Sequence, residues 1–494
     1  MTHSLAIRSV SLKFVLCLFT IVLADFLFFR QPAGWTAGLF AATVLLLTLS
    51  AHLQILRTPG GKPLLFLTAL LLPAMIYRPG ILPLFMFLLG LGSLLILAKR
   101  GRIHDAAAWL RDLRYMALRF FTRWYRDSRV LAAIRRKRGT RLWQGISYCL
   151  MPAVFTIAFL WLFTKANPVF AAFFDHLNLR LSLLSQPFGR WFFWGLTGSA
   201  VWSLLRPKLP KTKPPSFAQK ADEGNRTGSL DENKWATPRS LSVSLIIFNT
   251  LFALQNTSDI AYLWRGIKLP DGMSYAQYAH AGAYPLIVTA LLAAGYILIC
   301  FNDTKRRGKF NAAEKLVLLW IAQNIFLVFS AMNRLLQYID AYSLTSLRIA
   351  ALIWMLLVAG GLALITIRVF CGKRNQWLVN MNVIALLAVL YGSCFVNFDR
   401  IIAQYNVHHA REITGNTEKS YFDFYYMNRL GAESIAALEW FQYNANLTPG
   451  NRRLLQDNLS YQKTRLKNDV QNWRSWTLQK HLLAQKHGLI NAAY

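Results

Sequence analysis

Long apolar stretches alternate with segments rich in Arg and Lys throughout the first 396 residues of this chain. They are too apolar and too numerous to be buried in one water-soluble core, because a soluble helix needs polar side chains on its outer face. A helix needs about 20 residues to cross the hydrocarbon of a bilayer, and on that basis the sequence predicts an all-α, polytopic transmembrane helical bundle of about eleven spans. The predicted spans are 12–29, 34–54, 63–78, 80–98, 143–164, 189–205, 241–262, 281–301, 313–333, 347–368 and 377–396.

The chain is strongly basic. Its formal net charge is +33, from 55 Lys and Arg against 22 Asp and Glu, and such an excess often indicates nucleic acid as a partner. Here the basic residues lie between the apolar stretches, where they fix topology and meet anionic lipid headgroups. We therefore expect the lipid bilayer and its anionic headgroups as partners, and no binding of nucleic acid.

The basic segments also indicate which ends of the spans face the cytoplasm. Segment 99–142 contains fourteen Lys and Arg and segment 206–240 contains eight, whereas the alternate loops 263–280 and 334–346 contain far fewer. Both basic segments fall on one side of the membrane if the N-terminus is cytoplasmic. The positive-inside rule then places the C-terminal tail, residues 397–494, outside the cytoplasm.

Composition divides the chain into four parts. Residues 1–205 form a first transmembrane half of six spans, and residues 241–396 form a second half of five. Segment 206–240 between them is rich in Pro, Lys and Gly, which predicts a flexible cytoplasmic linker.

The tail, 397–494, is soluble in character. Helical periodicity over 434–443, a turn at Thr448-Pro449-Gly450 and the absence of Gly and Pro from 451–487 predict a helical hairpin docked on the outer surface.

The basic segment 99–142 contains an amphipathic pattern. Within 103–125, apolar residues such as Ile103, Ala107 and Leu110 recur at helical spacing, with arginines elsewhere around the helix. This pattern predicts a helix that lies on the cytoplasmic leaflet. Two roles stay open for it: lipid sensing or partner docking, and the plainer role of fixing the topology.

Motifs that carry chemistry are absent from the sequence. There is no phosphate-binding glycine loop, dinucleotide fingerprint, HExxH, GxSxG or paired CxxC. The adjacent His408 and His409 point in different directions on any regular backbone, so they do not form a metal site together. We therefore expect no cofactor and no metal, assign no catalytic residue, and do not expect an enzyme.

A set of polar residues gathers instead at one predicted depth, near the outer ends of the spans. Ionisable groups in a span usually face the bundle interior or water. One interpretation is an outward-facing polar cavity, with Asp259, Asp340 and Arg334 as its charges and His280 as a proton carrier. The other is that these groups only cap helix ends at the headgroup level. The candidate residues are Asp25, Asn256, Asp259, His280, Tyr284, Asn333, Arg334 and Asp340.

Several segments resemble a bacterial family of multi-pass membrane proteins known only as a domain of unknown function (the 4173/4153 group). The most specific is 269–286, which begins Leu269-Pro270-Asp271-Gly272, and shorter ones are 23–28, 166–169 and 341–348. The resemblance implies the polytopic fold and a bacterial inner-membrane location, and it implies no reaction. It marks the outer loop 265–286 as a functional element, either the cover of a binding mouth or an aromatic interfacial anchor.

Three functional hypotheses follow. The first is a non-enzymatic inner-membrane protein with a sensor, scaffold or envelope-accessory role, whose tail, 397–494, binds an envelope protein. The second is a transporter or flippase of a small solute or lipid, which needs polar residues at both membrane faces. The third is a membrane enzyme on a lipid-linked substrate, with Asp259 or His280 as general base. An enzyme gathers its polar residues at one face, so their distribution separates the last two.

Overall fold

The computed structural model describes residues 10–103, 105–120, 127, 188–210, 238–261, 312–416 and 419–490. These residues form helices and connecting loops and contain no strand, which confirms the predicted all-α class. The chain divides into two compact units. The first comprises Met1–Lys213 and Trp473–Leu478, and the second comprises Pro214–Asn472 and Gln479–Tyr494. The division after Lys213 lies inside the segment 206–240 that separates the two predicted halves.

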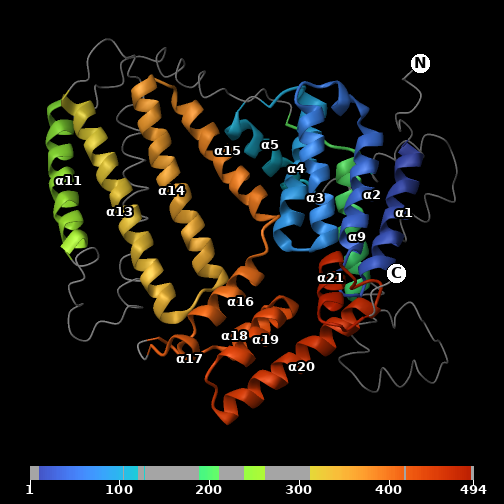
Figure 1. Ribbon diagram of the computed structural model, residues 1–494. Coiled ribbons are helices and arrows are strands. Elements are labelled where there is room, and N and C mark those ends of the chain that lie inside the picture. The colour runs from blue at the N-terminus through green and yellow to red at the C-terminus, as the bar shows by residue number, and fades with distance from the viewer. Residues whose placement is uncertain are drawn as a thin grey trace, which may run out of the picture. The chain divides into compact units, whose positions relative to one another are not determined.

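The first unit is a bundle in which α1 packs against α9, and α2, α3 and α4 pack in sequence (Figure 1). Its helices α1 and α9 are antiparallel, because the Lys13 ammonium donates to the Leu205 carbonyl (3.2 Å) and the Cys17 thiol donates to the Gly198 carbonyl (3.6 Å). The helices are α1 (Val10–Phe28), α2 (Thr36–Ala51), η1 (Leu53–Arg57), α3 (Gly61–Tyr77), α4 (Ile81–Arg100), α5 (Ala106–Leu118) and α9 (Phe188–Leu205).

Helix α5 packs on α4 through a face that the sequence pattern did not mark. Asp105 caps its first turn by accepting from the Ala108 N–H (2.5 Å), and the buried Asp112 accepts from the Arg100 guanidinium (2.9 Å). The predicted apolar stripe stays exposed at Ile103 and Leu110. Polar contacts, together with Leu113 against Gly92 of α4, therefore attach α5 to the bundle. Ile103 and Leu110 are left for the lipid contact that the sequence predicts.

The second unit places four apolar helices beside one another, with the first helices of the tail at one end of α13 and α14 (Figure 1). Its long helices are α11 (Pro238–Asp259), α13 (Ala312–Tyr342), α14 (Ser346–Cys371) and α15 (Asn375–Ser393). Its tail helices are α16 (Phe398–His409), α17 (Arg411–Thr414), α18 (Phe424–Arg429), η3 (Gly431–Ser434), α19 (Ile435–Asn444), α20 (Pro449–Gln471) and α21 (Leu478–Lys486).

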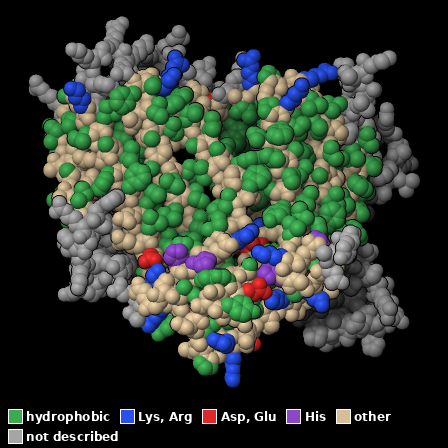
Figure 2. All heavy atoms as spheres, in the orientation of Figure 1, with side chains coloured by type: hydrophobic (Ala, Val, Ile, Leu, Met, Phe, Trp, Pro, Cys, Tyr) green, Lys and Arg blue, Asp and Glu red, His purple; other side chains and the backbone are tan. Residues whose placement is uncertain are grey.

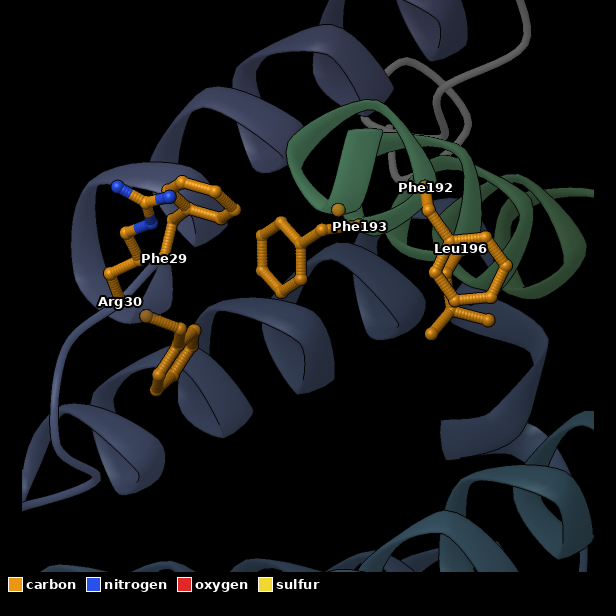
Figure 3. Close-up of a pocket in the computed structure, with 7 residues that line it drawn as sticks. Phe29, Arg30, Phe192, Phe193 and Leu196 are labelled. Atoms are coloured by element: carbon orange, nitrogen blue, oxygen red, sulfur yellow. The ribbon is translucent and has the colours of Figure 1, made fainter. Parts of the chain in front are cut away.

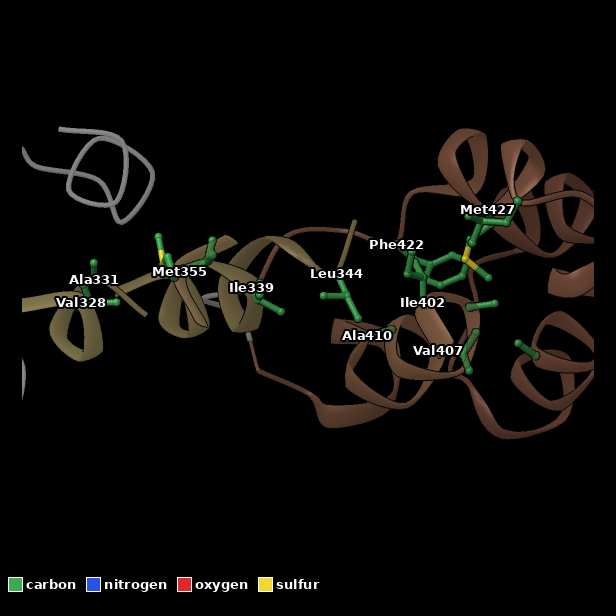
Figure 4. Packing of buried hydrophobic residues seen from close by; sticks show 14 of the residues in the cluster. Val328, Ala331, Ile339, Leu344, Met355, Ile402, Val407, Ala410, Phe422 and Met427 are labelled. Atoms are coloured by element: carbon green, nitrogen blue, oxygen red, sulfur yellow. The ribbon is translucent and has the colours of Figure 1, made fainter. Parts of the chain in front are cut away.

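One continuous apolar core joins the long helices of this unit to its tail. It runs from Val328 and Ile339 on α13, through Leu344 in the turn before α14, to Ile402 on α16 and Phe422 ahead of α18 (Figure 4). The first tail helices therefore fold as part of the second unit.

Among the residues that the structure describes, four helices are long and apolar enough to cross a membrane: Ile81–Arg100, Lys315–Tyr342, Ser346–Cys371 and Asn375–Ser393. Two shorter apolar helices are Thr36–Ala51 and Gly61–Tyr77. Each predicted span coincides with a helix except 143–164 and 281–301, which lie outside the described residues. Hydrophobic side chains cover the long helices of both units, and charged and histidine side chains gather over the tail helices (Figure 2). The full count of eleven crossings stays a prediction.

The predicted hairpin of the tail is present as α19 packed on α20, but its second arm is shorter than 451–487. Helix α20 ends at Gln471 and α21 begins only at Leu478, so a single helix over this segment was a wrong prediction. The residues between are held in the first unit, where the Trp35 N–H donates to the Trp476 carbonyl (2.8 Å) and the Trp35 indole donates to the Trp473 carbonyl (2.7 Å). These two carbonyls accept hydrogen bonds from Trp35 instead of from residues farther along a helix.

Candidate functional site

A polar seam runs between α11 and α13. The Asn249 side-chain amide donates to the Leu316 carbonyl (3.1 Å), and the Asn256 amide donates to the Gln323 carbonyl (3.4 Å). The two contacts are seven residues apart on both helices, so α11 and α13 are parallel and in a heptad-like register. The predicted spans 241–262 and 313–333 must also run in the same direction, because one predicted span, 281–301, lies between them in the chain.

Aromatic packing separates the two asparagine contacts. The Trp320 ring of α13 stacks on Phe248 with centroids 5.2 Å apart and meets Phe252 edge-on at 5.9 Å. Such pairs add to the stability that their buried area gives. The seam is therefore a packed interface in which polar and aromatic layers alternate.

A buried ion pair closes the seam. Asp259 and Arg334 are 2% and 7% exposed, and the Arg334 guanidinium donates to Oδ1 of Asp259. The Gln255 amide donates to the same oxygen (3.0 Å). The other carboxylate oxygen, Oδ2, has no hydrogen-bond partner among the residues that the structure describes, and neither has the hydroxyl of Ser330, one turn before Arg334. A buried pair of this kind is tolerated only because each charge neutralises the other.

The distribution of side chains on α11 is the reverse of that on a soluble helix. Three of its buried residues, Asn249, Asn256 and Asp259, are polar. Large apolar residues such as Leu251 and Leu254, the latter 72% exposed, lie outside. A helix with polar groups inside and apolar groups outside fits lipid rather than water around it.

The other predicted residues of the second unit do not join this pair. Asp340 lies on the surface with its side chain 59% exposed, and the Lys419 ammonium donates to it (2.7 Å). Asn333 is half-buried on α13, beside Arg334 in the chain. His280 and Tyr284 lie outside the described residues. Of the eight candidates, the structure brings together Asn256, Asp259 and Arg334.

Asp25 belongs to the first unit, where it has partners that the sequence pattern did not single out. The Arg190 guanidinium holds both carboxylate oxygens, at 2.9 Å and 2.5 Å, and the Trp194 indole donates to Oδ1 (2.8 Å). Both partners lie on α9. These partners follow from the antiparallel pairing of α1 with α9, and the sequence pattern does not indicate that pairing.

A cavity of about 410 Å³ lies beside this ion pair, between the end of α1 and the start of α9 (Figure 3). At the edge of the cavity, the Arg190 guanidinium carbon lies 5.1 Å from the centroid of the Phe29 ring. The wall of the cavity is almost entirely apolar, and one cation, Arg30, lies at the rim of the cavity. The lining residues are Phe28, Phe29, Arg30, Gly189, Phe192, Phe193 and Leu196.

The chemistry open to these sites is limited by how their charges are engaged. Within the described parts of the chain, no three His, Cys, Asp or Glu side chains lie close enough to hold a metal ion. The seam offers hydrogen-bond acceptors and a neutralised carboxylate, and the cavity offers apolar surface with a cation. Binding fits these arrangements better than acid–base catalysis does.

Comparison with known proteins gives a family and no function. A family model described as a domain of unknown function (DUF4153) matches residues 14–440. No curated protein and no solved structure matches the chain. The match begins in α1 and ends within α19, so α20 and α21 lie beyond it. Because the family model covers most of the chain, this protein belongs to the DUF4153 family of domains of unknown function.

Proposed function

We propose that this chain is a multi-pass protein of the bacterial inner membrane with a sensor, scaffold or envelope-accessory role, and not an enzyme. In this proposal the N-terminus is cytoplasmic and the tail is periplasmic. Family membership, the four helices of spanning length and the reversed polarity of α11 support the membrane location. The polar seam explains why α11 is less apolar than the other long helices although its outer face is apolar.

The observation that carries the proposal is that every acidic residue of the predicted polar site has a basic partner within the chain. Asp25 pairs with Arg190, Asp259 pairs with Arg334, and Asp340 pairs with Lys419. A general acid or base must have a proton to exchange with a substrate and must be reachable by it. Closed pairs stabilise a structure instead, which fits a protein that holds or reports a conformation.

The tail supplies a surface for an envelope partner. Tyr421, Tyr425 and Tyr443 are large, rigid and exposed, and Tyr443 is 84% exposed. Tyrosine is enriched at protein interfaces because it offers a broad apolar ring and a hydroxyl at small entropic loss. We assign partner binding to this part of the tail.

Two experiments test the proposal. A compartment-sensitive reporter fused after Tyr494, with a second one within 206–240, should report a periplasmic tail and a cytoplasmic linker. A photo-crosslinking residue at Tyr443 should then give a discrete protein adduct in living cells. The same residue at Ile246, on the apolar outer face of α11, is the control and should label lipid. A cytoplasmic tail, or no protein adduct at Tyr443, would contradict the proposal.

One observation favours transport as a second candidate. The side-chain oxygens Oδ1 of Asn249 and Asn256 and Oδ2 of Asp259 are buried and lack hydrogen-bond partners in the described parts of the chain. A row of acceptors within a span can guide a solute that carries donors. If the seam conducts, Asn256→Leu should abolish uptake by proteoliposomes while the protein level stays normal. If no solute gradient is dissipated by the native protein, this candidate falls.

A further inference from the structure

Arg30 has a backbone conformation that is unusual for its residue type. Its φ is +56°, in the left-handed region that glycine adopts freely and other residues rarely adopt. Strained positions of this kind persist where the side chain is needed at that place, and they gather at functional sites. A glycine or asparagine would end α1 here with less strain, so the presence of an arginine calls for a reason.

The strained turn places the Arg30 guanidinium at the rim of the cavity between α1 and α9 (Figure 3). Its guanidinium carbon lies 5.7 Å from the centroid of the Phe29 ring. No carboxylate pairs with Arg30 among the described residues. Asp25, on the helix that precedes Arg30, is paired with Arg190 and Trp194. Arg30 is therefore an exposed cation that can pair with an anion from outside the described chain.

The cavity itself is apolar and open. Phe193 on α9 points toward Phe29, which follows α1, with ring centroids 6.1 Å apart (Figure 3). Phe28, Phe192 and Leu196 also line the cavity. Phe192 is largely exposed, and so is the neighbouring Phe26 on α1. In water an open aromatic slot of this kind would promote association. In a bilayer the available apolar occupant is an acyl chain.

We propose that this cavity is a binding site for one anionic phospholipid, with an acyl chain between the phenylalanines of α1 and α9 and the phosphate on Arg30. Arginine suits the phosphate because its planar guanidinium donates two parallel hydrogen bonds to it. The Asp25–Arg190 pair beside the slot is neutral overall and does not repel the phosphate. The site is independent of the polar seam and of the partner surface on the tail.

The first test separates the charge of Arg30 from its strain. The full chain is purified in a mild detergent, and its thermal unfolding is followed with added phosphatidylglycerol, phosphatidylcholine or inorganic phosphate. Phosphatidylglycerol should raise the unfolding temperature selectively. Arg30→Gly should unfold at the same or a higher temperature without lipid, because the strain is relieved, and should bind phosphatidylglycerol roughly tenfold more weakly, because one charge-assisted contact is lost.

The second test fills the slot. A Cβ added at Gly189 meets nothing within 4 Å, so Gly189→Leu should fold and should place its side chain in the cavity that Gly189 lines. We expect native mass spectrometry to show the loss of retained phosphatidylglycerol from this variant. The matched control is Gly195→Leu, on the same helix, where a Cβ is equally free but does not line the cavity. The control should retain the lipid.

Three outcomes would overturn the proposal. Equal stabilisation by phosphatidylcholine would show that Arg30 does not select the headgroup. Equal stabilisation by inorganic phosphate would show that the acyl chain is not held. Retention of phosphatidylglycerol by both Arg30→Gly and Gly189→Leu would place the bound lipid elsewhere on the protein.

Discussion

Asn406 pairs with both backbone groups of Leu344, accepting from its N–H at 2.7 Å and donating to its carbonyl at 3.0 Å. The side chain of Asn406 on α16 thus acts as a peptide group toward the turn between α13 and α14. Both residues are buried. The contact attaches the first tail helix to the long helices of the second unit.

Replacement of Asn406 should therefore destabilise this unit. Asn406→Ala leaves the N–H and carbonyl of Leu344 buried without partners, and we expect the free energy of unfolding to fall by about 2–4 kcal/mol. Thermal or urea unfolding of the detergent-solubilised protein measures it. Asn444→Ala, which removes an exposed amide bonded only to its own helix, should change it by less than about 0.5 kcal/mol. Equal effects of the two variants would show that the Leu344 contact is not stabilising.

The two charges of the seam, Asp259 and Arg334, should affect the stability of the protein as a pair. Arg334→Gln leaves the buried carboxylate of Asp259 without its cation, and we expect a loss of about 3–5 kcal/mol. Addition of Asp259→Asn should recover part of this loss, because a neutral amide remains in place of the isolated charge. The exposed Asp340→Asn is the control, with an expected change of about 0–1 kcal/mol. A double variant less stable than Arg334→Gln would contradict a buried, mutually neutralising pair.

Gly34 should be required for the binding of residues 473–478 within the first unit. A Cβ at this position would clash with the Arg474 carbonyl oxygen and lie 2.6 Å from that of Trp476, and both are backbone atoms. We expect Gly34→Ala to displace the segment and to expose the bond after Arg474 to trypsin. Limited proteolysis followed by mass spectrometry detects the cleavage. Gly450→Ala, where a Cβ meets nothing within 4 Å, should leave that bond protected.

The tail should lose stability in alkali through Tyr405. Burial, and then the negative charge of Asp340, raise the pKa of this phenol above its ordinary value of 10.0. The folded state therefore keeps the proton after the unfolded state has lost it. Stability should be fully present below the unfolded pKa and should fall as pH rises from there through the folded pKa. Tyr405→Phe should flatten this fall in unfolding curves recorded across that range, and an unchanged slope would rule Tyr405 out.

Local patterns in the sequence correctly predicted the positions of most of the described helices and the residues on one face of the polar seam. Asn249, Asn256 and Asp259 share a face by spacing alone, and the structure buries all three against α13. The periodicity of an ideal helix determines which residues share a face, so this prediction needed no knowledge of the partner helix.

Other features depend on contacts between distant segments, which spacing does not contain. Arg190 is 165 positions from Asp25, and only the register of α1 against α9 makes them partners. The end of α20 at Gln471 is marked by neither Gly nor Pro. Beyond that end the carbonyls of Trp473 and Trp476 accept from Trp35, more than 400 residues earlier in the chain. The left-handed backbone of Arg30 likewise contradicts the local preference of its residue type.

The three polar contacts of α11 have a mechanical consequence. They lie at Asn249, Asn256 and Asp259, so the steps between them are seven and then three residues. A slide of α11 along α13 by one turn or by two would separate Asp259 from Arg334 and leave both charges without their partner. The ion pair therefore opposes sliding of the two helices past each other. A rotation or tilt of α11 and α13 together keeps the pair intact.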